Sequence, residues 1–219
     1  MAEKEKERAA QKVEQLLLQQ TEQLKYVFFW QPNTNLSGDE IDVSCLCQWQ
    51  PSEFRVENDV YSCAEQYMMA EKARVFEDDE TCKLIMRATD PKEMKALGRQ
   101  VKGFQKDVWD NVKYSIVLNG NYFKFSQNEH MRDFLFSTGD SVLVEASPLD
   151  KVWGIGLGED DEESSNPHSW KGLNLLGFAL MEVRDDLRRM YENYSKINWD
   201  SFQDKTSQEP FCPFSHAQL

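Results

Sequence analysis

The 219-residue sequence lacks long hydrophobic runs and any pattern typical of an export signal. No apolar stretch approaches the roughly 18 residues that a membrane-spanning helix requires. The N-terminal segment MAEKEKER is charged and has no apolar core, so we expect no secretory signal there. These absences favour a cytoplasmic protein, with a nuclear location as the alternative, and no membrane partner.

Basic residues are scarce relative to acidic ones. The chain has 25 lysines and arginines against 38 aspartates and glutamates, which gives a formal net charge of −13. Proteins that follow nucleic acid over many phosphates need a basic surface, so this balance argues against extended, nonspecific binding. A small basic pocket for one nucleotide remains compatible with it. Part of the acid excess lies in residues 158–165, GEDDEESS, which we interpret as a solvated loop.

The cysteines do not form the pattern of a disulfide framework. They are odd in number and irregularly spaced: Cys45, Cys47, Cys63, Cys82 and Cys212. Reduced thiols in the cytosol or nucleus are the simplest interpretation. Cys45 and Cys47 could be combined with Cys212 and His216 into a zinc site, but a one-residue gap is atypical of zinc ligands, and we set this site aside. The sequence gives no other reason to expect a metal or an organic cofactor.

Length and composition indicate one domain with additional segments at its ends. Forty per cent of the residues are apolar, 12% are aromatic and six are tryptophans, which is enough for a sizeable core. We divide the chain into a polar N-terminal helix or arm at residues 1–25, a main domain at 26–194 and a loosely ordered C-terminal tail at 195–219. No internal repeat is visible.

Hydrophobic periodicity and turn residues predict short strands and several helices in the main domain. We expect strands at 26–30 and 141–147, and helices at 63–76, 80–88, 91–98, 104–118, 129–138 and from Trp170 to about 193. Asp90 and Pro91 have the residue types of a helix start. The sequence Asn119-Gly-Asn predicts a turn after the helix at 104–118, leading into 122–125.

The segment Tyr61–Phe76 carries the residues that most suggest chemistry. Ser62 is followed three residues later by Glu65, a capping-box pattern that predicts a helix starting at Cys63. Glu65 and Lys72 are seven positions apart, so they project from one face of that helix. A carboxylate and an amine on a half-buried face can serve as an acid/base and a nucleophile. Helical Glu/Lys pairs are also common on solvated surfaces, so the spacing alone leaves both interpretations open.

Two loops offer further candidate residues. Gln48 and Trp49, at a strand end, can present an amide and an indole to a base, although packing alone would also explain them. The segment after the strand at 141–147 places Asp150 and Trp153 at a strand exit, where functional side chains are frequent. Its alternative is a turn that Asp150 caps and Trp153 covers. Residues 98–103, GRQVKG, fit neither the dinucleotide fingerprint nor the phosphate loop in their glycine spacing.

Several phrases taken together resemble one family. They are CAEQYMMAEKA at 63–73, ALGRQVKGF at 96–104, KFSQN at 124–128, LVEASPLDKVWGIGL at 143–157 and WKGLNLLGFALMEVR at 170–184. In unbroken order over residues 26–190 they are similar to the NADAR, or YbiA-like, family of N-glycosidases. The first loop departs from the pattern, because many members have Ser before an Asn or Gln and an aromatic residue, where this chain has Cys47-Gln48-Trp49.

The resemblance implies a helix-rich α+β fold, a single domain with a small β-sheet, and hydrolysis of N-glycosidic bonds in ribosylated amines. Two substrate classes accompany it. One is ADP-ribose attached to guanine in DNA, RNA or a nucleotide, which we expect here, with nucleic acid as a transient partner. The other comprises the ribosylamino-pyrimidine phosphates of riboflavin biosynthesis. A module that binds ADP-ribose without turnover is the third alternative. The oligomeric state is open.

On this basis each candidate residue receives an expected role. Lys72 is the nucleophile that forms a Schiff base, Glu65 the general acid/base, and Asp150 a second carboxylate. A non-covalent path with two carboxylates and an oxocarbenium-like transition state is the alternative. The expected substrate-binding residues are Gln48, Trp49, Arg99, Trp109, Lys124, Glu145, Ser147, Trp153 and Gly154. Arg99 and Lys124 are the expected phosphate contacts, and the tryptophans the expected stacking surfaces.

Overall fold

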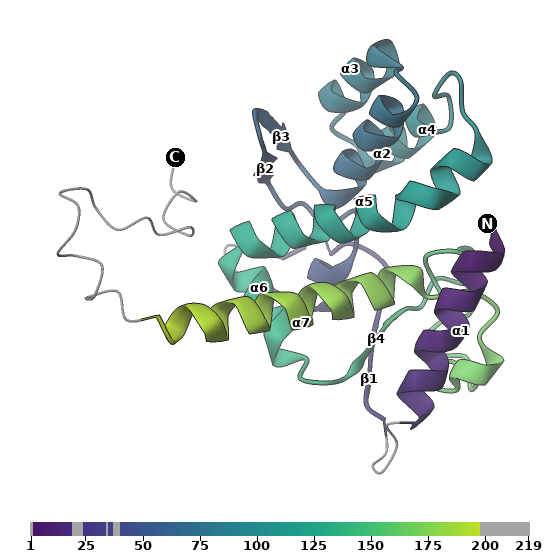
Figure 1. The fold of residues 1–219 in the computed structure, drawn as a ribbon, viewed down its shortest axis with the longest axis vertical. Coiled ribbons are helices and arrows are strands. Elements are labelled where there is room, and N and C mark those ends of the chain that lie inside the picture. The colour runs from purple at the N-terminus through teal and green to yellow at the C-terminus, as the bar shows by residue number, and fades with distance from the viewer. Residues whose placement is uncertain (1, 19–23, 34, 37–39, 198–219) are drawn as a thin grey trace, which may run out of the picture.

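The structure, a computed structural model, describes residues 2–18, 24–33, 35–36 and 40–197. In this part of the chain, helices predominate and pack around two small β-sheets (Figure 1). The helix-rich α+β class expected from the family resemblance is confirmed. The expected C-terminal tail lies outside the described residues from position 198 onward. Among the described helices, none is long and apolar enough to cross a membrane.

One sheet pairs two strands from distant parts of the chain. Strand β1 (Tyr26–Phe29) runs parallel to β4 (Val142–Glu145), with Phe29 opposite Glu145. Every residue of β4 is buried, as expected for a parallel strand that is covered on both faces. The carboxyl ends of both strands therefore point to the same edge of the sheet, which places Glu145 close to the segment that follows β1.

Helix α7 (Leu175–Ser195) holds the outer side of β4. Asn174, the residue before the helix, donates from Nδ2 to the Leu143 carbonyl (2.9 Å) and accepts at Oδ1 from the Glu145 N–H (3.0 Å). A Cβ at Gly177 would stand well inside van der Waals distance of the Leu143 carbonyl oxygen, so only glycine permits this approach. The expected helix start at Trp170 is wrong by five residues, because residues 170–174 form the connection that carries these contacts.

Helix α2 (Ala64–Val75) is the centre of the helical layer. It packs against α3 (Asp79–Arg87), α4 (Pro91–Gly98) and α5 (Lys106–Gln127). The capping box expected at its start is wrong, since the N-cap residue is Cys63 and makes no side-chain cap bond. The Ser62 hydroxyl instead donates to Gln66 Oε1, and the Glu65 N–H donates to the Gln48 carbonyl (3.0 Å). The Glu65 carboxyl group is thereby left free of a capping role.

Helix α5 is continuous where the sequence predicted a turn. Gly120 sits in its interior, where a Cβ would approach Tyr67 Cδ1 of α2 to 2.6 Å, so the glycine allows the two helices to pack closely. Asn121 is fully buried and donates to Gln48 Oε1 (3.0 Å) and to the Val117 carbonyl (2.8 Å). Both residues are typical of turns, but here tertiary packing determines their conformation.

The remaining expected elements are largely confirmed. Helix α3 and helix α6 (Glu129–Ser137) lie where hydrophobic periodicity placed them, and Asp90 caps α4 by accepting from the Lys92 N–H (2.9 Å). A second sheet pairs β2 (Phe54–Val56) with β3 (Asp59–Tyr61) in an antiparallel hairpin.

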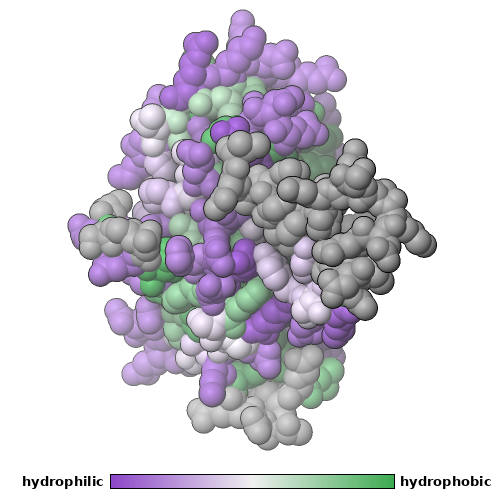
Figure 2. Space-filling view, turned by 90° about the vertical axis from the view of Figure 1, so that its left-hand side faces the viewer, coloured by the Kyte–Doolittle hydropathy of each residue, from purple (hydrophilic) through white to green (hydrophobic). Residues whose placement is uncertain are grey.

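Helix α1 (Ala2–Leu18) lies beside α5 and α7 through ion pairs such as Lys12–Glu182 (2.7 Å) and Lys113–Glu5 (3.0 Å). On the face shown in Figure 2, the described residues expose hydrophobic side chains only in small areas between hydrophilic ones. This surface gives no indication of a broad apolar contact on that face.

Candidate functional site

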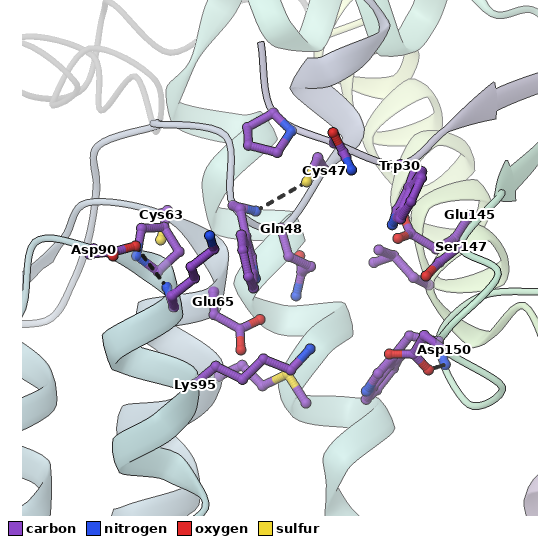
Figure 3. A pocket seen from close by; sticks show the side chains of 18 of the residues that line it. Trp30, Cys47, Gln48, Cys63, Glu65, Asp90, Lys95, Glu145, Ser147 and Asp150 are labelled. Carbon is purple, nitrogen blue, oxygen red and sulfur yellow. Dashed lines mark hydrogen bonds between the residues drawn. The ribbon is translucent and has the colours of Figure 1, made fainter. Parts of the chain in front are cut away.

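A cavity of about 1120 Å³ opens where α2 and α4 face the carboxyl ends of β1 and β4. The loops at residues 47–51 and 147–153 complete its walls. This volume is slightly above the roughly 300–1,000 Å³ typical of small-molecule sites. Glu65 and Lys95 enter from the helical side, whereas Glu145, Ser147 and Asp150 enter from the side of the sheet (Figure 3).

Three carboxyl groups converge in this cavity. Glu65 and Glu145 are only 5% and 9% exposed, and Asp150 lies beside them. Burial raises the pKa of Glu145 well above its usual value, and the neighbouring charges of Asp150 and Glu65 raise it further. Burial also raises the pKa of Glu65, but Lys95, hydrogen bonding with Trp49, and Arg99 oppose that increase. Of the two glutamates, Glu145 therefore has the stronger tendency to stay protonated.

One oxygen of this cluster has no partner. Glu145 Oε2 is buried and makes no hydrogen bond, whereas the backbone N–H and carbonyl of Glu145 are bonded to Asn174 and Ile155. A buried polar atom without a partner is costly in a folded protein, and such atoms concentrate at functional sites. The oxygen therefore marks a position where a ligand can form a hydrogen bond.

Asp150 combines two of the roles considered for it. Its Oδ1 accepts from the N–H groups of Val152 (2.9 Å) and Trp153 (2.8 Å), so it does cap the turn after Pro148. Its side chain lines the cavity as well, together with Trp153. Gly154 does not line the cavity. A Cβ there would approach the Glu145 carbonyl oxygen to 2.8 Å, so Gly154 lets the turn pack against β4 and does not provide a substrate contact.

The Gln48–Trp49 loop is fixed by two buried side chains of α5. Lys124 Nζ donates to the Cys47 carbonyl (3.0 Å), and Asn121 donates to Gln48. Lys124 is 0% exposed, and burial lowers the pKa of its amine. The expected phosphate contact of Lys124 is therefore wrong, because its amine faces the protein interior. Lys124 instead positions the Gln48–Trp49 loop. Sequence reasoning missed Asn121, although Val117, Asn121 and Lys124 have helical spacing.

Lys72 lies next to the cavity and does not line it. Its Nζ donates to the Gly98 carbonyl (2.7 Å) and stands 4.4 Å from the Phe104 ring centroid and 5.6 Å from that of Trp109. Its pKa is lowered by burial and by the charge of Arg99. The cavity-lining residue Met68 precedes it by one helical turn. Trp109, which was expected to stack on a ligand, is 8% exposed and does not line the cavity.

Among the lysines that line the cavity, Lys95 is the one whose charge acts on the carboxyl cluster. Its Nζ is 5.6 Å from the Trp49 ring centroid, and its charge acts on both Glu65 and Glu145. Sequence reasoning missed this residue, although Lys92, Lys95 and Arg99 recur at intervals of three and four on a helix. Of the other residues expected to bind substrate, Gln48, Trp49, Arg99, Glu145, Ser147 and Trp153 all line the cavity.

Comparisons with known proteins agree with the family resemblance and with the fold. The NADAR domain matches residues 28–188. N-glycosidase R617 of Acanthamoeba polyphaga mimivirus is 42% identical over 167 residues, which are 74% of this chain and 96% of that protein. The chloroplastic riboflavin biosynthesis protein PYRR of Zea mays is 36% identical over 107 residues, 47% of this chain but 15% of that protein. The NMR structure of the Escherichia coli protein YbiA superposes with a TM-score of 0.61 at 24% identity, over 80% of this chain and 92% of that one.

Proposed function

Because the chain belongs to the NADAR domain family, we propose that it is an N-glycosidase that cleaves the bond between ribose C1′ and an exocyclic amine. The preferred substrate in this proposal is ADP-ribosylated guanine, in DNA, RNA or a free nucleotide. The name of the mimivirus relative supports the reaction class. The observation that carries the proposal is the convergence of Glu65, Glu145 and Asp150 in a cavity walled by indoles.

The cavity suits a nucleotide in composition as well as in size. The indoles of Trp49 and Trp153 provide flat apolar walls on which a base can stack. The side chain of Ser147 stands among the carboxyl groups and can form a hydrogen bond with ribose. Aromatic walls and a polar floor together match a ligand with a flat base and a hydroxylated sugar.

The proposed chemistry begins at the exocyclic nitrogen. Its lone pair opens the ribose ring: the C1′–O4′ bond breaks, O4′ takes a proton, and C1′ becomes an iminium carbon. A neutral lysine amine adds to C1′, and the heterocyclic amine leaves with a proton from a carboxylic acid. A lysine Schiff base remains, and water adds to it, releasing ribose and restoring the lysine. A nucleoside bonded through a ring nitrogen does not open its sugar ring easily in this way.

In this mechanism Glu145 is the acid and Glu65 the base. Glu145 keeps its proton because of burial and neighbouring negative charge, and its unpartnered Oε2 can reach a leaving amine. Burial raises the pKa of Glu65 as well, but the charges of Lys95 and Arg99 oppose that increase, and on this ground we assign Glu65 the part of the base that takes a proton from water. Pairs of carboxyl groups that their surroundings push apart in pKa commonly divide acid and base roles in this way. Asp150 stabilises the cationic iminium.

The proposed nucleophile is Lys72. Its lowered pKa favours the neutral amine that the reaction needs, and its flexible side chain must leave the Gly98 carbonyl to reach the cavity. Lys95 is the competing candidate, because its amine already lines the cavity. Borohydride reduction during turnover of ADP-ribosylated guanosine, followed by peptide mapping, locates the ribose adduct. We expect it on Lys72, with Lys72→Ala losing several orders of magnitude in kcat and Lys95→Ala far less.

An adduct on Lys95 would transfer the nucleophilic role to that residue. If both alanine variants keep activity within about tenfold and no adduct forms, the covalent path is refuted in favour of the oxocarbenium-like one. The similarity to PYRR favours a second candidate substrate, the ribosylamino-pyrimidine phosphates of riboflavin biosynthesis. Supplying both substrates to the purified protein separates the two, according to which one releases its base. Ligand binding without product would favour a binding module.

A further inference from the structure

The cavity wall formed by α4 carries positive charge in an otherwise acidic protein. Lys92, Lys95 and Arg99 all line the cavity, and their spacing of three and four residues places them on one face of the helix. The acidic residue within this stretch, Glu93, is exposed and does not line the cavity. The charges of this helix are therefore sorted, with the cations toward the cavity and the carboxylate away from it.

These cations are available to a ligand. Within the described residues, Lys92 and Arg99 make no ion pair and their side chains no hydrogen bond, whereas Lys102, just beyond them, is paired with Glu80 at 2.7 Å. The nearby Asp90 carboxylate is engaged in capping the helix through the Lys92 N–H. Lys95 and Arg99 lie close enough to Glu65 for their charges to lower the pKa of that carboxyl group, but within the described residues no direct ion pair holds Lys92 or Arg99 in place.

The helix is held at a fixed distance from the carboxyl groups. Met94 is fully buried, and Gly98 packs so closely on Met69 of α2 that a Cβ there would overlap its sulfur. The α2 helix also carries Glu65, so this packing fixes the position of α4 relative to that carboxyl group. Such a fixed arrangement lowers the cost of ordering charged groups around a ligand.

We propose that the face of α4 formed by Lys92, Lys95 and Arg99 binds the diphosphate of the substrate. This rests on the proposed function, which supplies a ribosylated nucleotide as the ligand. With a helical rise of about 1.5 Å per residue, Lys92 and Arg99 are roughly 10 Å apart along the axis. Two linked phosphates can contact both ends of such a row at the same time. Arg99 offers a bidentate contact and Lys92 a point charge.

The test uses the full chain and a double variant, Lys92→Gln/Arg99→Gln, which leaves Lys95 and the carboxyl cluster unchanged. Calorimetry measures the affinity for ADP-ribose and for adenosine. We expect the affinity for ADP-ribose to fall about 10²- to 10⁴-fold, as for the loss of two charged hydrogen bonds, while that for adenosine stays the same. Lys102→Gln is the control, because Lys102 is already ion-paired with Glu80, and its affinity for ADP-ribose should match that of the parent protein.

Three results would overturn the assignment. The first is an unchanged affinity of the double variant for ADP-ribose, and the second is a parent protein that binds ADP-ribose no better than adenosine. The third is a double variant that loses affinity for a single-stranded oligonucleotide but not for ADP-ribose, which would show that the cations of α4 bind the phosphates of a nucleic-acid strand instead. Hydrolysis is measured separately as guanosine released from its ADP-ribosylated form. A parent that binds ADP-ribose through α4 but releases nothing refutes the proposed function and leaves the diphosphate site intact.

Discussion

Replacing Glu145 with glutamine tests the acid assigned to the reaction, because it keeps the shape and hydrogen-bonding capacity of the side chain but removes its proton chemistry. Burial and the adjacent carboxylates raise the pKa of Glu145 in the folded protein, whereas in the unfolded chain a glutamate has a pKa of about 4.3. Between these two pKa values the folded state holds a proton that the unfolded state has lost.

The sign of the stability effect follows from this difference. As pH rises above about 4.3, the contribution of Glu145 to the free energy of unfolding falls by about 1.4 kcal/mol for each pH unit, until the folded pKa is reached. Glu145→Gln lacks this loss. We therefore expect the variant and the parent to have similar stability below pH 4, and the variant to become increasingly more stable toward neutral pH. Urea unfolding at several pH values measures the difference.

Activity provides the second measurement. Loss of a general acid costs about 10²- to 10⁴-fold, so kcat should fall by that factor in Glu145→Gln, and the decline of activity at high pH should disappear with the acid. Glu53→Gln, at an exposed position, is the matched control. If parent and variant show the same pH dependence of stability, the carboxyl group does not hold its proton as inferred. Unchanged kcat would refute its catalytic role.

Two further substitutions test how the site is held in place. Gly177→Ala gains about 1 kcal/mol of helix propensity, but the new Cβ overlaps the Leu143 carbonyl, so chemical denaturation should show that the free energy of unfolding falls by at least about 1 kcal/mol. Gly158→Ala is the control, because nothing lies near its Cβ. Equal stability of Gly177→Ala and the parent protein would contradict the packing argument. In Lys124→Met, the Cys47 carbonyl loses its hydrogen-bond donor, so kcat/KM should fall about tenfold while the circular dichroism spectrum stays unchanged. A kcat/KM equal to that of the parent would show that the Gln48–Trp49 loop does not need this hydrogen bond. Burial lowers the pKa of Lys124, so this amine loses its proton at a lower pH in the folded protein than in the unfolded chain. The contribution of Lys124 to the free energy of unfolding should therefore rise with pH toward about 10. The same rise in Lys124→Met would refute this.

Local sequence signals identified much of the fold because several elements follow ordinary helix and strand rules. Asp90-Pro91 starts α4, and the hydrophobic alternation at 141–147 predicted the strand that the structure places at Val142–Glu145. The Asn119-Gly-Asn turn failed for a physical reason. Gly120 is small enough for the close contact of α5 with Tyr67, and the Asn121 amide finds its partners on another segment. Neither contact can be read from neighbouring residues.

Local sequence signals predicted only some of the residues of the candidate site. Glu65 was identified through a capping pattern that the structure does not form, and Asp150 through its position after a strand. Lys124 was expected to contact phosphate, but a lysine whose amine bonds a buried carbonyl is part of the scaffold. Lys95 was overlooked because its importance depends on which face of α4 meets the cavity. That depends on how the helix packs.

The side-chain amide of Asn174 has a consequence for how this protein meets other chains. It bonds Leu143 and Glu145 as the peptide group of an adjacent strand would, and Ile155 occupies the carbonyl of Glu145. The hydrogen-bonding groups at the free edge of β4 are thus occupied by a side chain and a loop, as they would be by a third strand. Extended peptides and exposed strands of other molecules commonly attach by continuing a sheet at such a border. On this side of β4 that route to recruitment or aggregation is closed.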